Sequence, residues 1–212
     1  MKRFFLSLGV VLVCVSGWAS VPKTVVIDAG HGGWDRGGIP GQFGCEKTLA
    51  LDVALRLQPL LEEHGVKTVM TRKYDTFIPL SKRVAIANSY PGALLVSVHF
   101  NAGFRRGAAG VEVFYHKRHS ADVARCVESK LNAMTADESR GVKQRGYYVL
   151  KHTRNPAILV ECGFLTNPQE AALCRYPAYR QKLAEAIASA IVQKEVTGGI
   201  AEKMDESNEQ DG

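Results

Sequence analysis

The most constraining feature of this sequence is an alternation between short apolar runs and longer segments of helical periodicity. The apolar runs that predict strands cover residues 24–29, 66–72, 93–100, 110–115, 147–151 and 157–161. The segments of helical period cover residues 46–64, 80–88, 121–134 and 177–196. Several of the strand runs are almost continuously hydrophobic, which is typical of strands covered on both faces. The pattern therefore predicts an α/β fold, a single domain with a mainly parallel mixed sheet of about six strands flanked by helices.

Both ends of the chain differ in composition from its middle. Lys2 and Arg3 precede an apolar run over residues 4–15, and small residues follow at Gly17 and Ala19. This predicts a signal peptide over residues 1–19, a catalytic or binding domain over residues 20–198, and an acidic, disordered tail over residues 199–212. The apolar run is shorter than the about 20 residues that span a membrane, so no stable membrane anchor is expected after cleavage. Lipidation at Cys14 stays an alternative, although Val13 before it is larger than such sites prefer.

Composition narrows the class of protein and its partners. A chain of 212 residues with 46% hydrophobic and 23% charged residues is too apolar to be disordered and too long to be a small disulfide scaffold. The net charge of +6 permits an anionic partner, but Lys and Arg are scattered without an aromatic-interleaved stripe, so no nucleic acid is expected. Export, to the periplasm or to the cell wall and medium, permits disulfides, and the spacing of Cys45, Cys126, Cys162 and Cys174 predicts no particular pairing.

Four side chains with chemical potential stand at predicted strand ends or at a helix start. His31 lies in a glycine-flanked turn after the first strand, Glu46 opens a helix, and His99 and Glu161 end two later strands. Reactive groups gather beyond the carboxyl ends of parallel strands. Taken singly, the first three have ordinary alternatives: a surface histidine, a carboxylate at a helix dipole, and a core histidine. An ordinary structural role explains Glu161 less well, because a carboxyl group in apolar surroundings needs a charged partner or a raised pKa.

The residue types fit one requirement together. Two imidazoles and one carboxylate give zinc a three-ligand site with an open position, and a second carboxylate can serve as base. Because the chain has no H-E-x-x-H helix, such ligands must converge from separate elements.

These segments resemble the zinc-dependent N-acetylmuramoyl-L-alanine amidases of the cell wall. The matching motifs include VVIDAGHGG at 25–33, EK at 46–47, SVHFNA at 97–102 and VECGFLTNP at 160–168. Thr71, Arg72, Asp75, Arg83, Ala87 and Asn88 add single matches. The resemblance runs from about residue 24 to residue 196 and supports the predicted fold.

The resemblance implies a function and roles for the four side chains. His31, Glu46 and His99 would be the zinc ligands, and Glu161 the catalytic carboxylate. The substrate would be peptidoglycan, cut at the amide between the lactyl group of N-acetylmuramic acid and L-alanine. Some relatives carry a blocking helix after the strand that corresponds to residues 110–115, which an activator withdraws. Here the next helix starts near Ala121, so no activator is expected to be required.

Other functions stay open at this point. They are a different zinc amidohydrolase, such as a stem-peptide peptidase or a deacetylase, and a peptidoglycan-binding module without catalysis. A penicillin-binding serine enzyme would use Ser20 in S-x-x-K, although no K-T-G follows. A cysteine nucleophile would use Cys45 or Cys162, which flank the expected site.

Supporting roles are expected for further residues. Asp28, Ser97 and Asn101 are near enough in sequence to orient ligands. Lys143 or Arg36 could meet a stem-peptide carboxylate. Arg72 and Asp75 are expected to form a structural ion pair.

Overall fold

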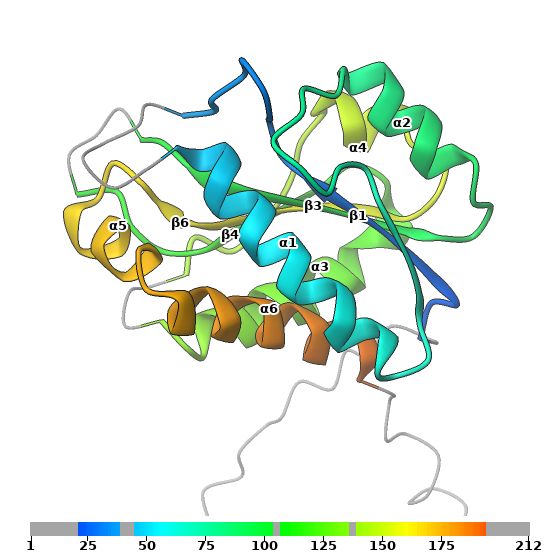
Figure 1. Ribbon diagram of the computed structural model, residues 1–212. Coiled ribbons are helices and arrows are strands. Elements are labelled where there is room, and N and C mark those ends of the chain that lie inside the picture. Colours follow the sequence, from blue (N-terminus) through cyan, green and yellow to red (C-terminus); the bar gives the residue numbers. More distant parts are fainter. Residues whose placement is uncertain (1–20, 39–44, 104–106, 136–138, 194–212) are drawn as a thin grey trace, which may run out of the picture.

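The computed structural model describes residues 21–38, 45–103, 107–135 and 139–193, which form one α/β domain (Figure 1). The strands are β1 (Thr24–Ala29), β2 (Lys67–Met70), β3 (Leu94–Asn101), β4 (Glu112–Tyr115), β5 (Val142–Gln144) and β6 (Ala157–Phe164). The helices are α1 (Glu46–Glu62), α2 (Leu80–Asn88), α3 (Ala121–Asn132), α4 (Tyr148–His152), α5 (Pro168–Cys174) and α6 (Pro177–Val192), with a 3-10 turn η1 (Arg118–Ser120). The strands form one sheet in the order β2-β1-β3-β6-β4-β5, and β4 runs antiparallel to β6 while the other pairs are parallel. The predicted fold class is confirmed.

Helices cover both faces of the sheet, and the strand sequences explain why. Val25 and Ile27 belong to the core cluster under α1, α3 and α6, whereas Val26 packs with residues of α2 and α4 on the other face. Figure 1 shows α1, α3 and α6 on one side of the sheet and α2 and α4 on the other. Since successive strand residues point to opposite faces, a strand with both faces covered is apolar over most of its length, as β1 is at residues 25–27 and 29.

One sequence prediction of secondary structure is wrong, and one strand was not predicted. Residues 147–151, predicted as a strand, lie mostly in helix α4, where Val149 and Leu150 are buried against the α2 side of the sheet. A short apolar run fits a buried helical turn as well as a strand. The sixth strand is instead β5, a three-residue edge strand whose half-exposed residues give little hydrophobic signal.

Helix α5 was not predicted, although its start carries a recognisable signal. Asn167 caps it by accepting hydrogen bonds from the backbone N–H groups of Gln169 and Glu170, and Pro168 occupies the first turn. The predicted signal peptide and acidic tail lie outside the described residues. Cys45, Cys162 and Cys174 are free thiols. Among the helices described, none is both long enough and apolar enough to cross a membrane.

A buried ion pair ties the central strands to α2. Asp28 and Arg83 are 1% and 2% exposed, and Arg83 Nη1 lies 2.7 Å from Asp28 Oδ1. The hydroxyls of Thr71 and Ser97 donate to the same carboxylate, each at 2.7 Å. Burial alone would raise the pKa of Asp28, but the Arg83 charge and these hydrogen bonds hold it below its usual value. Arg83 also donates to the carbonyls of Ala29 and His31, so the pair fixes the turn after β1.

Removing Arg83 should therefore be costly. Arg83→Ala leaves the Asp28 carboxylate buried without its charge partner, and we expect a loss of about 3–5 kcal/mol in the free energy of unfolding, measured by urea denaturation. Arg56→Ala is the matched control, because the Arg56–Asp52 pair is about a third exposed and should cost about 1 kcal/mol or less. Equal losses for the two variants would contradict this interpretation of the buried pair.

Candidate metal centre

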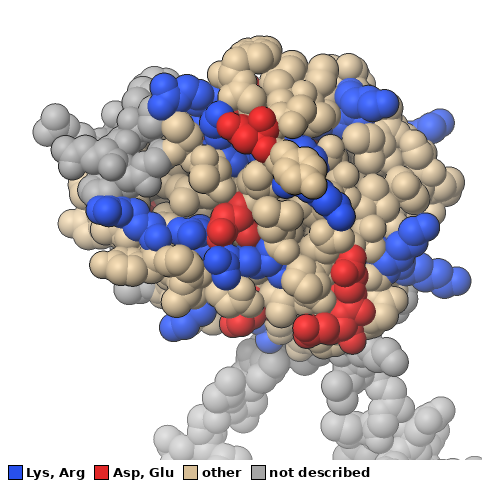
Figure 2. All heavy atoms as spheres, in the orientation of Figure 1, with Lys and Arg blue, Asp and Glu red and all other residues tan. Residues whose placement is uncertain are grey.

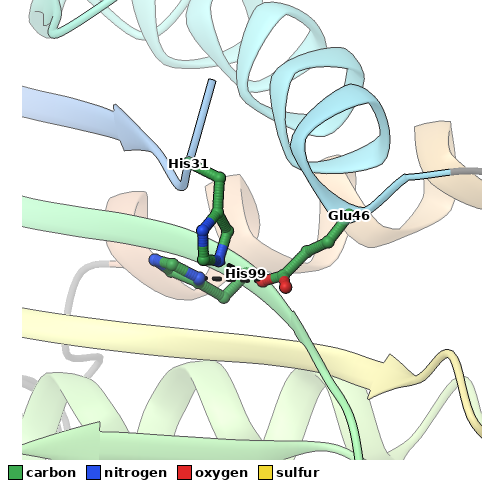
Figure 3. A group of neighbouring side chains, drawn as sticks. All are labelled: His31, Glu46 and His99. Carbon is green, nitrogen blue, oxygen red and sulfur yellow. Dashed lines mark hydrogen bonds and ion pairs between the residues drawn. The ribbon is translucent and has the colours of Figure 1, made fainter. Parts of the chain in front are cut away.

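Three of the predicted site residues meet at the carboxyl edge of the sheet, each from a different element. His31 follows β1, Glu46 is the first residue of α1, and His99 lies near the end of β3, and the three side chains point toward one another (Figure 3). His31 adopts φ +58°, a left-handed backbone conformation that turns its imidazole into the site. Gly30 permits the close approach of β3, because a Cβ there would lie 2.4 Å from the His99 ring.

The Glu46 carboxylate lies between the two imidazoles. Its Oε1 is 3.1 Å from His31 Nε2 and 2.9 Å from His99 Nδ1. The backbone N–H groups of Gly38 and Phe100 donate to the same carboxylate. Burial would raise the pKa of Glu46, but its hydrogen bonds to His31 and His99 and their charges hold it well below its usual value. The site therefore keeps this carboxylate ionised at neutral pH.

The donor set fits a zinc-like cation. One ligand atom from each of the three residues lies within 4.8 Å of the others. Donors about 2.0–2.1 Å from one tetrahedral ion are about 3.4 Å apart, close to the nitrogen–oxygen distances observed here. Two imidazoles and one carboxylate leave the fourth tetrahedral position to water or substrate, as catalytic zinc sites require.

Asp35 orients the first imidazole, and sequence analysis missed it. Its Oδ1 lies 2.9 Å from His31 Nδ1, so the other ring nitrogen, Nε2, faces Glu46. A carboxylate on the far nitrogen of a ligating histidine fixes its tautomer and ring orientation. The position of Asp35 four residues after His31, in the same glycine-rich turn, was the available signal.

Glu161 lies beside the cluster, on the strand next to His99. The backbones of His99 and Glu161 are paired in the parallel ladder of β3 and β6. A cavity of about 400 Å³ is lined by Glu161 together with His31, Glu46 and His99. The Glu161 Oε2 atom is buried and has no hydrogen-bond partner among the described residues. Burial raises the pKa of Glu161 to about 7, with His99 opposing and Glu46 and Glu112 adding to the shift.

The other expected roles are met only in part. Ser97 donates to Asp28, which pairs with Arg83, and Arg83 donates to the His31 carbonyl, so these residues support His31 only indirectly. Asn101 donates to Glu112 rather than to one of the candidate metal ligands. Glu112, which sequence analysis did not single out, pairs across β4 and β6 with Glu161.

The two candidate cations for a substrate carboxylate have partners within the chain. Lys143 forms an ion pair with Glu112, and Arg36 donates to the Cys45 sulfur.

The prediction of an ion pair between Arg72 and Asp75 is wrong. Arg72 donates to four backbone carbonyls, while Asp75 pairs with Lys47, because the folded loops bring those partners closer.

Burial raises the pKa of the Cys162 thiol well above its usual value, which disfavours a thiolate nucleophile there.

Comparison with known proteins agrees with this geometry. The family model for N-acetylmuramoyl-L-alanine amidase matches residues 25–193. An uncharacterised protein of Bacillus subtilis, YqiI, is 37% identical over 173 residues, covering 80% of this chain and 83% of its own.

Solved structures match over a similar span. A crystal structure of an N-acetylmuramoyl-L-alanine amidase from Clostridium difficile 630 superimposes with a TM-score of 0.76 and 35% identity, covering 81% of this chain and 96% of that one. The CwlD amidase of Clostridioides difficile, solved in complex with the GerS lipoprotein, matches with a TM-score of 0.76 and 31% identity, covering 80% and 96%. This chain therefore belongs to the N-acetylmuramoyl-L-alanine amidase family and is a peptidoglycan-hydrolysing enzyme.

Proposed function

We propose that this amidase is zinc-dependent, with His31, Glu46 and His99 as the metal ligands and Glu161 as the catalytic carboxylate. The observation that carries the proposal is the convergence of three metal donors with a buried, unpartnered carboxylate oxygen in one cavity. The bond cut is the amide between the lactyl group of N-acetylmuramic acid and L-alanine.

The proposed chemistry divides between the metal and the protein. Zinc in such a site supplies a water of lowered pKa and polarises a carbonyl oxygen. The chain's own residues position the reactants and move the proton. Glu161 accepts a proton from the attacking water, and the water oxygen bonds to the lactyl carbonyl carbon. Glu161 then donates the proton to the leaving nitrogen as the C–N bond breaks, giving a lactyl carboxylate and a free L-alanine amine.

The environment of Glu161 suits this role. A carboxyl whose pKa lies near 7 can both accept and donate a proton at neutral pH. A carboxyl at its usual pKa of 4.5 is a weaker base and holds almost no proton to donate at that pH. Glu46, which lines the same cavity, is held ionised by its imidazole partners and is therefore suited to bind the metal. The two carboxylates thus have separate tasks set by their surroundings.

The remaining parts of the proposal concern the chain outside the site. Residues 1–19 are an export signal, residues 20–198 the catalytic domain, and residues 199–212 an acidic tail. With such a signal the enzyme would act in the periplasm or at the cell wall.

Only residues 116–120 connect β4 to α3, and this span cannot hold a blocking helix of several turns. We therefore propose that the enzyme needs no activator to withdraw such a helix.

Metal binding can be tested without an activity assay. We expect about one zinc per chain by plasma mass spectrometry of the purified protein, and loss of the metal in His31→Ala. His64→Ala is the control, because that histidine is exposed at the end of α1 and should leave the metal content unchanged. Full zinc content in His31→Ala would remove this residue from the ligand set.

Glu161→Gln separates chemistry from metal binding. The amide keeps the size of the side chain but accepts no proton, so we expect kcat on purified peptidoglycan to fall by at least about 100-fold with unchanged zinc content. Release of stem peptides with a free L-alanine amine is followed by mass spectrometry. Glu63→Gln, at the exposed end of α1, should keep full activity. Undiminished turnover in Glu161→Gln would refute the assigned role.

The raised pKa of Glu161 predicts an acid limb in the pH profile. Below its pKa the carboxyl is protonated and accepts no proton, so kcat/KM should fall as pH decreases. Without the metal the pKa of Glu161 is about 7, and a nearby cation lowers it, so the acid limb should lie below about pH 7. The profile is measured with zinc content checked at each pH. A flat profile across this range in zinc-loaded enzyme would contradict the prediction.

A further inference from the structure

An aromatic pair, the exposed Trp34 and the half-buried Phe77, lies at the rim of the cavity near His31. Trp34 is 76% exposed, and its ring lies 4.1 Å from that of Phe77, centroid to centroid, with the planes 31° apart. Phe77 itself lines the cavity together with His31 and Asp35. The pair therefore continues the wall of the site outward to solvent.

The turn that carries Trp34 is fixed on both sides. Gly32 and Asp35 exchange two backbone hydrogen bonds, of 2.9 and 3.2 Å, which close the turn with Trp34 inside it. The Gly33 N–H donates to Asp75 Oδ1, and Lys47 Nζ bridges the Gly33 carbonyl and Asp75 Oδ2. A Cβ on Gly33 would lie 2.7 Å from the Phe77 nitrogen, so the turn lies directly on the Phe77 backbone. The indole is thus presented by a rigid support.

The same turn serves the metal centre. Asp35 follows Trp34 and orients the His31 ring through Nδ1. The fold therefore couples the placement of the exposed indole to the placement of a proposed ligand. Exposing a large aromatic surface to water is unfavourable, and nothing in the packing of the domain core uses Trp34. A ligand that packs on the ring would remove this apolar surface from water.

The chemistry of the exposed ring indicates which half of the substrate it would contact. The scissile amide has a neutral, N-acetylated sugar on its acyl side and a peptide on its amine side. Two cations beside the Trp34 turn are engaged within the chain, since Lys47 Nζ contacts Asp75 and the Gly33 carbonyl, and Arg72 donates to four backbone carbonyls. The Trp34 ring thus offers an apolar face, which suits the apolar C–H face of a sugar.

We propose that Trp34, supported by Phe77, is a stacking platform for a pyranose ring of the glycan strand on the acyl side of the scissile amide. This rests on the proposed placement of the scissile bond at the His31, Glu46 and His99 cluster. Trp34 sets affinity for glycan-linked substrate and takes no part in proton transfer.

Tryptophan fluorescence tests the proposal without catalysis. The sequence has two tryptophans, Trp18 and Trp34, and Trp18 lies in the proposed export signal, so the protein that begins at Ser20 carries Trp34 as its sole indole reporter. Titration with peptide-free oligosaccharides of alternating N-acetylglucosamine and N-acetylmuramic acid should change the emission saturably, whereas free stem peptide should not. No change with the glycan, or a change with the peptide alone, would overturn the proposal. Because no bond is cut, this result is independent of the zinc mechanism.

Kinetics supply the second arm. On glycan-linked muropeptides we expect Trp34→Ala to raise KM about tenfold, with kcat within about twofold of the wild-type value, and Trp34→Phe to restore KM to within about threefold. Tyr74→Ala is the matched control, since Tyr74 is 77% exposed in the neighbouring loop and, unlike Trp34, takes part in none of the ring contacts between described aromatic residues. An unchanged KM in Trp34→Ala would refute the platform even if hydrolysis proceeds as proposed. Zinc content is measured for each variant.

Discussion

The site depends on the burial of the Glu46 carboxylate at the point where three elements meet. An ionised carboxylate that is 3% exposed requires positive partners, and the chain provides two imidazoles and two backbone N–H groups from β3 and the loops beside it. Those partners reach Glu46 only if β1 and β3 are adjacent and α1 begins above their carboxyl ends, as the sheet order dictates. The Asp28–Arg83 pair below holds the His31 turn in place. Fold and site are therefore parts of one buried polar network.

The environment divides the acidic groups of the cavity into two kinds. Glu46 is surrounded by donors and stays ionised, while Glu161, one strand away, has an oxygen that no described residue satisfies and a pKa raised by burial. Figure 2 shows Lys and Arg in separate groups interspersed with Asp and Glu over the face drawn there. Specificity is then better sought at the rim of the cavity, where the exposed Trp34 ring packs against Phe77, a residue of the cavity lining.

Sequence analysis predicted the central part of the molecule because that part is most constrained. Strands β1, β3 and β6 are apolar over most of their length on both faces, so periodicity located the sheet. The four candidate site residues were selected by their chemistry and by the resemblance. Glu161, expected at a strand end, lies inside β6, which continues to Phe164. Edge elements follow weaker rules. The run at 147–151 is apolar because α4 covers the sheet, and β5 is polar because it lies at the edge. The partners of Arg72 and the role of Asp35 depend on loop geometry, which no periodic pattern encodes.

The central claim is that three side chains from separate elements bind one cation beside Glu161. X-ray diffraction from crystals of the zinc-loaded protein, measured on either side of the zinc absorption edge, tests this directly. The account predicts a single anomalous peak in bonding contact with His31 Nε2, a Glu46 oxygen and His99 Nδ1, with Glu161 facing the open position. A peak on other residues, or none at this cluster in protein shown to contain zinc, would contradict it.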